Sequence, residues 1–322
     1  MNHVNKIMMG GSVILGLLLL LNLSTPYLYR SLPNDYERTE IILDSLSDNN
    51  FKPTIAIFGN SKAMTGINCK ILNNEMISDK AYNLSGVGQP LLESALYYPY
   101  LPASVNYVIQ CLNIPMFAKK PAISSEAALS FYMYGYRYNE NLNKFLSPYL
   151  DNYANKSPLI NNFQGRACLK VGLSTIIRKL TDDDAPGDEV SSLIYPYLYP
   201  SNRSELKYER DINQLNSDVN PLQNSELNKE CISLIFKLNN YFKHKGIKYF
   251  IVLMPENPDI KHTHDKITKN FIQSIENSLS DKVHLINCTS ILPNKDFYDA
   301  QHPNRNGAEK LSKMIVSHIK SI

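Results

Sequence analysis

The chain has 322 residues, of which 43% are hydrophobic and 20% are charged, so it can bury a globular core and is neither disordered nor fibrous. The formal net charge is only +3, and Lys and Arg are interspersed with acidic residues, which argues against nucleic acid as a partner. The five cysteines are widely spaced, odd in number and without a CxxC pair, which favours buried apolar cysteines over a disulfide framework or a zinc site.

The N-terminal segment predicts a membrane anchor. Residues 7–23 form an uncharged apolar run that follows Lys6, and its length of about 17 residues is at the short end of what spans a bilayer. A cleaved signal peptide is the alternative, although the run is long for one and no A-x-A-like site follows it before Pro26. Lys6 before the run and Arg30 after it weakly favour a cytoplasmic N-terminus. We therefore expect residues 1–25 to be an anchor or signal peptide, with the rest of the chain outside the cytoplasm.

Beyond this segment, strand and helix patterns alternate. Residues 26–51 are typical of a polar stalk, in which Ile41, Ile42, Leu43 and Leu46 share the apolar face of a short helix. The pattern then predicts buried strands at 54–58, 81–84, 105–114, 247–254 and 283–291, and helices at 89–100, 226–245, 265–279 and 306–320. Such alternation indicates an α/β domain over residues 52–322, with a mostly parallel sheet and helices on both faces.

A central segment, at about 118–223, interrupts the alternation. It is rich in Tyr, Asn and Pro, notably at 132–138 and 195–200. The acidic stretch at 181–189 is best interpreted as a solvated loop, because adjacent carboxylates repel one another and its Pro-Gly pair favours a turn. A calcium site there is the weaker alternative. We interpret the whole segment as an insertion within one domain.

Two short motifs carry the candidate chemistry. The first predicted strand runs directly into Gly59-Asn60-Ser61, which places Ser61 at the carboxyl edge of the sheet, where open α/β folds bind ligands. Asp299 precedes His302 by three residues on a loop before the last helix. A carboxylate at this spacing can hold Nδ1 of the imidazole and leave Nε2 to take a proton from a serine hydroxyl. A turn serine and a helix-entry histidine are the alternative interpretations of these residues.

On these residues the chain resembles the SGNH (GDSL-like) hydrolases, over about 54–117 and 226–322. Gly59-Asn60-Ser61 matches the first block of that family, with Asn60 in place of the common Asp, and Asp299 to His302 matches the last block. The resemblance implies a three-layer α/β/α, flavodoxin-like fold. It also implies a catalytic triad of Ser61, His302 and Asp299 that needs neither a cofactor nor a metal.

The resemblance further implies an oxyanion hole. Its donors fall by position on the backbone amide of Ser61, the backbone amide of Gly88 and the side-chain amide of Asn113, with Gly86 as a competitor for Gly88. The third block departs from the family pattern, because Cys111-Leu112-Asn113-Ile114 stands in place of Gly-x-Asn-Asp.

A single membrane segment followed by an outward-facing domain of this type is similar to proteins that modify cell-envelope polymers. The resemblance therefore implies O-acyl transfer or O-acyl ester hydrolysis on a surface polysaccharide, in the bacterial periplasm or at the cell surface. The expected partners are an acyl donor, a polysaccharide acceptor, the membrane and a multi-spanning membrane O-acyltransferase. A lipase or thioesterase is the enzymatic alternative, and a non-catalytic polymer-binding or assembly protein is the alternative from another class.

Overall fold

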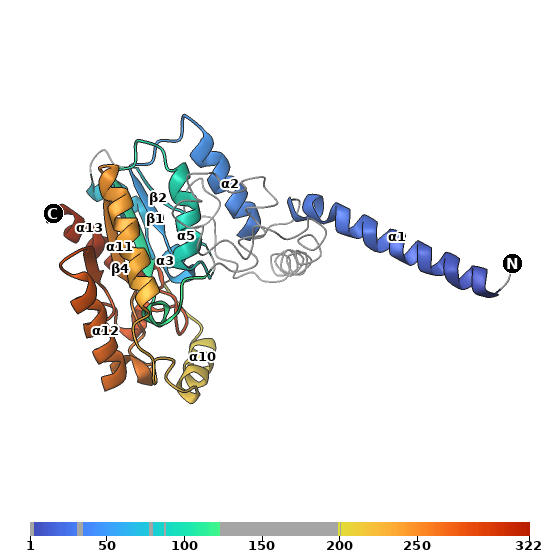
Figure 1. Ribbon diagram of the computed structural model, residues 1–322. Coiled ribbons are helices and arrows are strands. Elements are labelled where there is room, and N and C mark those ends of the chain that lie inside the picture. The colour runs from blue at the N-terminus through green and yellow to red at the C-terminus, as the bar shows by residue number, and fades with distance from the viewer. Residues whose placement is uncertain (1–2, 31–34, 77–79, 87, 123–198, 200) are drawn as a thin grey trace. The chain divides into compact units, whose positions relative to one another are not determined.

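The computed structural model describes residues 3–30, 35–76, 80–86, 88–122, 199 and 201–322 (Figure 1). The chain divides into two compact units, one of residues 1–40 and 123–185 and the other of residues 41–122 and 186–322. The second unit contains the sheet and every residue predicted for the site.

Five parallel strands form one sheet, in the order β2-β1-β3-β4-β5. The strands are β1 (Ile55–Phe58), β2 (Ala81–Asn83), β3 (Tyr107–Leu112), β4 (Lys248–Leu253) and β5 (His284–Asn287). Each lies within a predicted strand, and the predicted parallel α/β architecture is confirmed. The strand predicted over 283–291 ends early, because Asn287 Oδ1 accepts hydrogen bonds from the N–H and the hydroxyl of Thr289 (3.0 and 2.7 Å) and turns the chain.

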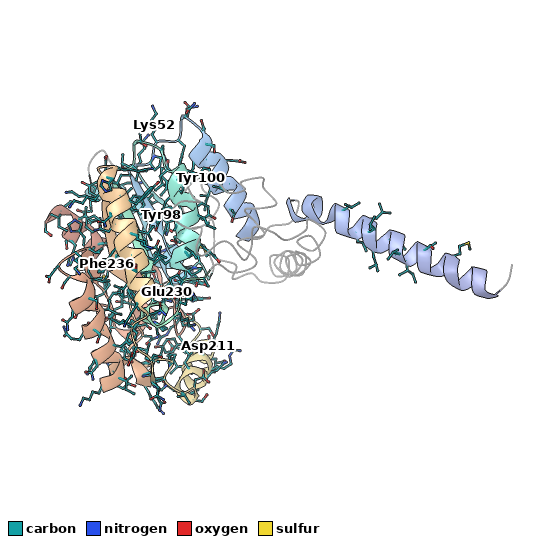
Figure 2. All side chains as sticks on the ribbon, viewed as in Figure 1. Lys52, Tyr98, Tyr100, Asp211, Glu230 and Phe236 are labelled. Atoms are coloured by element: carbon teal, nitrogen blue, oxygen red, sulfur yellow. The ribbon has the colours of Figure 1, made fainter. Side chains whose placement is uncertain are left out.

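Successive strand residues point to opposite faces of the sheet, and both faces are covered by helices. On one face, Ile57 and its neighbours on β3 and β4 join an apolar cluster with α3 (Ser61–Gly66), α4 (Cys69–Glu75) and α13 (Arg305–Lys320). On the other face, the Phe58 ring meets Tyr98 at 5.1 Å between centroids, and Tyr98 meets Phe242 at 4.8 Å. Tyr98 belongs to η1 (Tyr98–Tyr100) and Phe242 to α11 (Lys229–His244), and Figure 2 shows Tyr98 beside α11. Burial on both faces explains why the inner strands β1, β3 and β4 are apolar runs without alternation.

The predicted long helices are confirmed. They correspond to α5 (Leu91–Tyr97) with η1, α11, α12 (Lys266–Leu279) and α13. The sequence did not predict α3, α4 or α10 (Glu205–Ser217), nor the short 3-10 helices η2 (Ile114–Ala118), η3 (Lys261–His264) and η4 (Asn294–Asp296). Helices α3 and α4 have six and seven residues, too few to show an amphipathic period, and each begins at an asparagine cap, Asn60 or Asn68.

The N-terminal part of the chain is helical. It consists of α1 (His3–Arg30) and α2 (Asp35–Ser47). In α2, Ile42, Leu43 and Leu46 are buried and Ile41 is half-buried, which confirms the predicted apolar face. Within the described part of the chain, no helix combines the length and the apolarity needed to cross a bilayer, so the structure gives the predicted anchor no support.

Most of the predicted insertion lies outside the described residues, including the Tyr-rich segment at 132–138 and the acidic stretch at 181–189. Its C-terminal part is described and contains α10. The expected buried cysteines are confirmed for Cys69, Cys111, Cys231 and Cys288, which are free thiols, and the fifth lies outside the described residues.

Candidate active site

Ser61 is the first residue of the short helix α3, which follows β1 after a two-residue turn. Asn60 caps this helix, because its Oδ1 accepts a hydrogen bond from the N–H of Lys62 at 3.1 Å. At the other end, Nδ2 of the buried Asn83 donates to the carbonyl of Ala63 at 2.9 Å. An asparagine therefore performs the capping that an aspartate can also provide at position 60, and Ser61 is fixed at the carboxyl edge of the sheet.

Gly59 allows the tight turn before Ser61. Its φ is +156°, and a Cβ atom at this position would lie 2.7 Å from Cβ of Ala63 and 2.9 Å from both Cβ and O of Cys111. Two of these atoms belong to the neighbouring strand β3, whose displacement would cost packing and sheet hydrogen bonds. A glycine is therefore required to bring Ser61 this close to the end of β3.

His302 links Ser61 to Asp299. Its Nε2 lies 2.9 Å from Ser61 Oγ, across 241 positions of sequence, and its Nδ1 lies 3.0 and 2.9 Å from the two oxygens of Asp299. Because an ionised carboxylate only accepts hydrogen bonds, Nδ1 carries the proton, which leaves Nε2 as the acceptor for the Ser61 hydroxyl. The structure thus brings the three predicted side chains into one hydrogen-bonded chain. In this chain the Ser61 hydroxyl donates to His302 and His302 donates to Asp299, which is the direction needed for His302 to remove the serine proton.

The loop before α13 holds Asp299 in place. Asp299 Oδ1 accepts from the backbone N–H groups of Gln301 and His302, both at 2.8 Å. Burial raises the pKa of this carboxyl, but its hydrogen bond to His302, its electrostatic interaction with His302 and the two backbone N–H groups together outweigh burial and lower the pKa below the usual value. Asp299 is therefore ionised at neutral pH and orients the imidazole.

This lowered pKa predicts a pH-dependent stability. The folded state binds the proton of Asp299 less readily than the unfolded state, so the ionised carboxylate stabilises the fold above its unfolded pKa, and this contribution is lost as the pH falls through the lowered folded pKa. Asp299→Asn should destabilise the protein at neutral pH, and urea unfolding should show this deficit shrinking as the pH falls below about 5. A deficit that is constant with pH would contradict the pKa shift.

Two tyrosines that the sequence did not single out support the histidine loop. The rings of Tyr199 and Tyr298 stack at 4.2 Å, and the Tyr199 ring lies 5.8 Å from the His302 ring. The N–H of Tyr298 donates to the carbonyl of His302 at 2.8 Å. Tyr298 directly precedes Asp299, which was the available sequence signal. Tyr199 had none, because its contact with His302 depends on the path of the insertion.

The candidate oxyanion donors have distinct positions. The N–H of Gly86 donates to the carbonyl of Gly59 at 3.1 Å, so it is committed to the backbone and is the weaker candidate. Gly88 is exposed in a turn at φ +66°, a conformation that favours glycine. Asn113 follows β3, the neighbour of β1, and its Oδ1 is buried with no hydrogen-bond partner among the described residues.

Asn113 also lines a cavity of about 360 Å³, together with Lys62, Glu256, Gln301 and other residues. Lys62 is 5% exposed, and its Nζ lies 3.0 Å from Glu256 Oε1 and 3.4 Å from the carbonyl of Pro255. This ion pair was not predicted from the sequence, although Lys62 follows Ser61 and Glu256 follows a predicted strand. Both positions pointed to the carboxyl edge of the sheet.

No group of three or more His, Cys, Asp or Glu side chains that could hold a metal ion occurs within the described ranges. Asp265 serves as the N-cap of α12, where its carboxylate accepts a hydrogen bond from the N–H of Thr268 at 2.7 Å.

Comparison with known proteins adds little beyond the geometry. The model of an uncharacterised family matches residues 197–322. No curated protein matches the sequence. The matched range contains Asp299, His302 and Glu256 but begins after Ser61, so it covers one half of the candidate site.

Proposed function

We propose that the protein is a serine-dependent O-acyltransferase or O-acyl esterase, with Ser61 as the nucleophile, His302 as the general base and Asp299 as the residue that orients the base. The observation that carries the proposal is the unbroken chain from Ser61 Oγ to His302 Nε2 at 2.9 Å and from Nδ1 to Asp299 at 2.9 Å. Nucleophile, base and orienting carboxylate in this order are the requirements of covalent acyl transfer.

In the proposed reaction, Ser61 Oγ attacks an ester carbonyl while His302 Nε2 takes its proton. The oxyanion that forms accepts hydrogen bonds from the backbone amides of Ser61 and Gly88 and from Nδ2 of Asn113. Loss of one such donor commonly costs about 10²- to 10³-fold in turnover. His302 then protonates the leaving alcohol, and the acyl-enzyme is released when water or a sugar hydroxyl attacks, with His302 again accepting the proton.

We place the domain in the SGNH-like, flavodoxin-like group of α/β folds. The strand order β2-β1-β3-β4-β5 supports this placement. β2 lies on one side of β1, and β3, the next strand in sequence, lies on the other side of β1. In open parallel sheets, ligands bind at the carboxyl ends of the strands where the order reverses in this way. Ser61 follows β1 and Asn113 follows β3, so both candidates stand at that point.

For the substrate, we propose an O-acylated cell-envelope polysaccharide, with transfer to a sugar hydroxyl as the reaction that distinguishes the enzyme from a simple esterase. The proposal is tested by following an acyl group from p-nitrophenyl acetate in the presence of a soluble polysaccharide acceptor. A transferase yields acylated sugar at the expense of free acetate, and Ser61→Ala yields neither. Free acetate alone would establish an esterase. Polymer binding without turnover, unchanged in Ser61→Ala, would favour the non-catalytic alternative.

Membrane attachment outside the cytoplasm also stays a prediction from residues 7–23. The prediction rests on the length of this uncharged apolar run in the sequence. We expect the full chain to fractionate with membranes and a chain lacking residues 1–25 to fractionate as soluble protein. A mature N-terminus near Ser24 would instead identify a cleaved signal peptide.

A further inference from the structure

The cavity is lined by residues that are next in sequence to the proposed nucleophile and base, although Ser61 and His302 themselves are not among the lining residues. Lys62 directly follows Ser61, Gln301 directly precedes His302, and Asn113 is the proposed oxyanion donor; all three line the cavity. The cavity is therefore the candidate space for the acyl chain carried by Ser61, on the basis of these three lining residues.

The walls of the cavity are largely apolar and come from three separate segments of the chain. Ile114 and Pro115 belong to η2, Leu215 and Val219 to the end of α10 and the following loop, and Ile260 to the connection between β4 and η3. Leu215 and Ile260 also pack against the buried cluster of Tyr208, Ile212, Leu292, Phe297 and Ala300, which fixes the position of this wall. Apolar walls with a few converging polar groups are typical of small-molecule sites.

The volume exceeds what an acetyl group needs. With about 30 Å³ as the share of one water molecule, 360 Å³ has room for about ten groups of that size. An acetyl group has only three non-hydrogen atoms and would leave most of the apolar wall without contacts.

The charges in the cavity favour a neutral occupant. Lys62 and Glu256 pair at 3.0 Å, with side chains 6% and 15% exposed, so the buried ammonium and the carboxylate neutralise each other. The other charged or titratable lining groups are Asp218, which is exposed, and His262, whose Nε2 lies 2.7 Å from the Asp218 carbonyl. A charged acyl group would enter this space without a counter-ion, which is costly in an apolar surrounding.

We propose that this cavity is the acyl-binding site of the enzyme and that it accepts a neutral acyl group longer than acetyl, of about four to eight carbons, given room for about ten water-sized groups. The inference rests on the proposed function, because it assigns the acyl moiety of the same reaction. It also gives a role to the end of the predicted insertion, since Leu215 and Val219 form part of the wall.

A series of p-nitrophenyl esters tests the proposal. Each buried methylene contributes about fourfold, so kcat/KM should rise at least about tenfold from acetate to hexanoate and should be lower for the charged hemisuccinate than for butyrate. Leu215→Trp and Ile260→Trp fill the cavity from two different segments, and each should lower the ratio of hexanoate to acetate rates. The matched control is Ile267→Trp, on α12 and 42% exposed, which should keep the wild-type ratio.

Binding to Ser61→Ala separates this inference from the proposed reaction. By calorimetry, the neutral probe hexanamide should bind more tightly than acetamide, and the preference should fall when Ile260→Trp or Leu215→Trp is added. Ser61-dependent hydrolysis that is equal for all chain lengths, with no preference for hexanamide, would overturn the acyl site and leave the proposed function standing. Preferential binding of hexanamide without Ser61-dependent turnover would support the site and overturn the function. Neither binding nor turnover would overturn both.

Discussion

Ser61→Ala and His302→Ala are each expected to reduce the hydrolysis of p-nitrophenyl acetate by about 10⁴-fold or more, to near background. The two losses should be similar, and the double variant should lose no more than either single one, because a nucleophile and its base act as a unit. The physical basis is the 2.9 Å contact between Ser61 Oγ and His302 Nε2, through which the proton leaves the serine. Release of p-nitrophenol measures the rates.

Matched controls separate the site from general damage. Ser317→Ala and His244→Ala alter exposed residues of α13 and α11, and both should keep wild-type rates. Asn113→Ala should be milder than the triad variants, about 10²-fold, because two backbone donors would remain in the oxyanion hole. Melting temperatures of the Ser61 and His302 variants should stay close to wild type. Additive losses in the double variant would argue against a shared mechanism.

Glu256→Gln is expected to cause the largest loss of stability, about 3–5 kcal/mol in the free energy of unfolding. The substitution leaves the ammonium of Lys62 buried, with its side chain 6% exposed and no opposite charge. Replacing both partners, as Lys62→Met with Glu256→Leu, should restore much of the lost stability. The attraction within a buried ion pair only slightly exceeds the free energy needed to remove both charges from water. Urea unfolding of the three proteins measures the effect.

The exposed pair of Lys313 and Glu309 on α13 is the control for this prediction. Its atoms are 2.7 Å apart, but the side chains are 57% and 48% exposed. Glu309→Gln should therefore change the free energy of unfolding by less than about 1 kcal/mol. Equal losses for Glu256→Gln and Glu309→Gln would show that burial does not govern the strength of the Lys62 ion pair.

The sheet could be predicted from the sequence because its inner strands are buried on both faces. Strands buried in this way consist of consecutive apolar residues, which are easy to recognise in a sequence. The sequence also predicted Ser61 with Asp299 and His302, because local chemistry reveals each half: a turn after a strand, and a carboxylate three residues before a histidine. That these halves meet could be anticipated from the parallel sheet, since the carboxyl ends of its strands share one edge.

What the sequence did not reveal depends on the order of the strands. Lys62 meets Glu256 across 194 positions because of where β4 lies in the sheet, and alternation alone does not determine that order. The hydrogen bond from the Gly86 N–H to the Gly59 carbonyl, which makes Gly86 the weaker candidate, is a tertiary contact that no local pattern encodes. Tyr199 reaches His302 from the insertion for the same kind of reason.

The most direct test of the central claim, that Ser61 is an acylated nucleophile, is mass spectrometry of the protein after a brief incubation with p-nitrophenyl acetate and an acid quench. We expect one acetyl group on the peptide that contains Ser61, and none on that peptide in Ser61→Ala or at early times in His302→Ala. Release of p-nitrophenol at the same rate from wild type and Ser61→Ala, with no acetyl group on Ser61, would contradict the account.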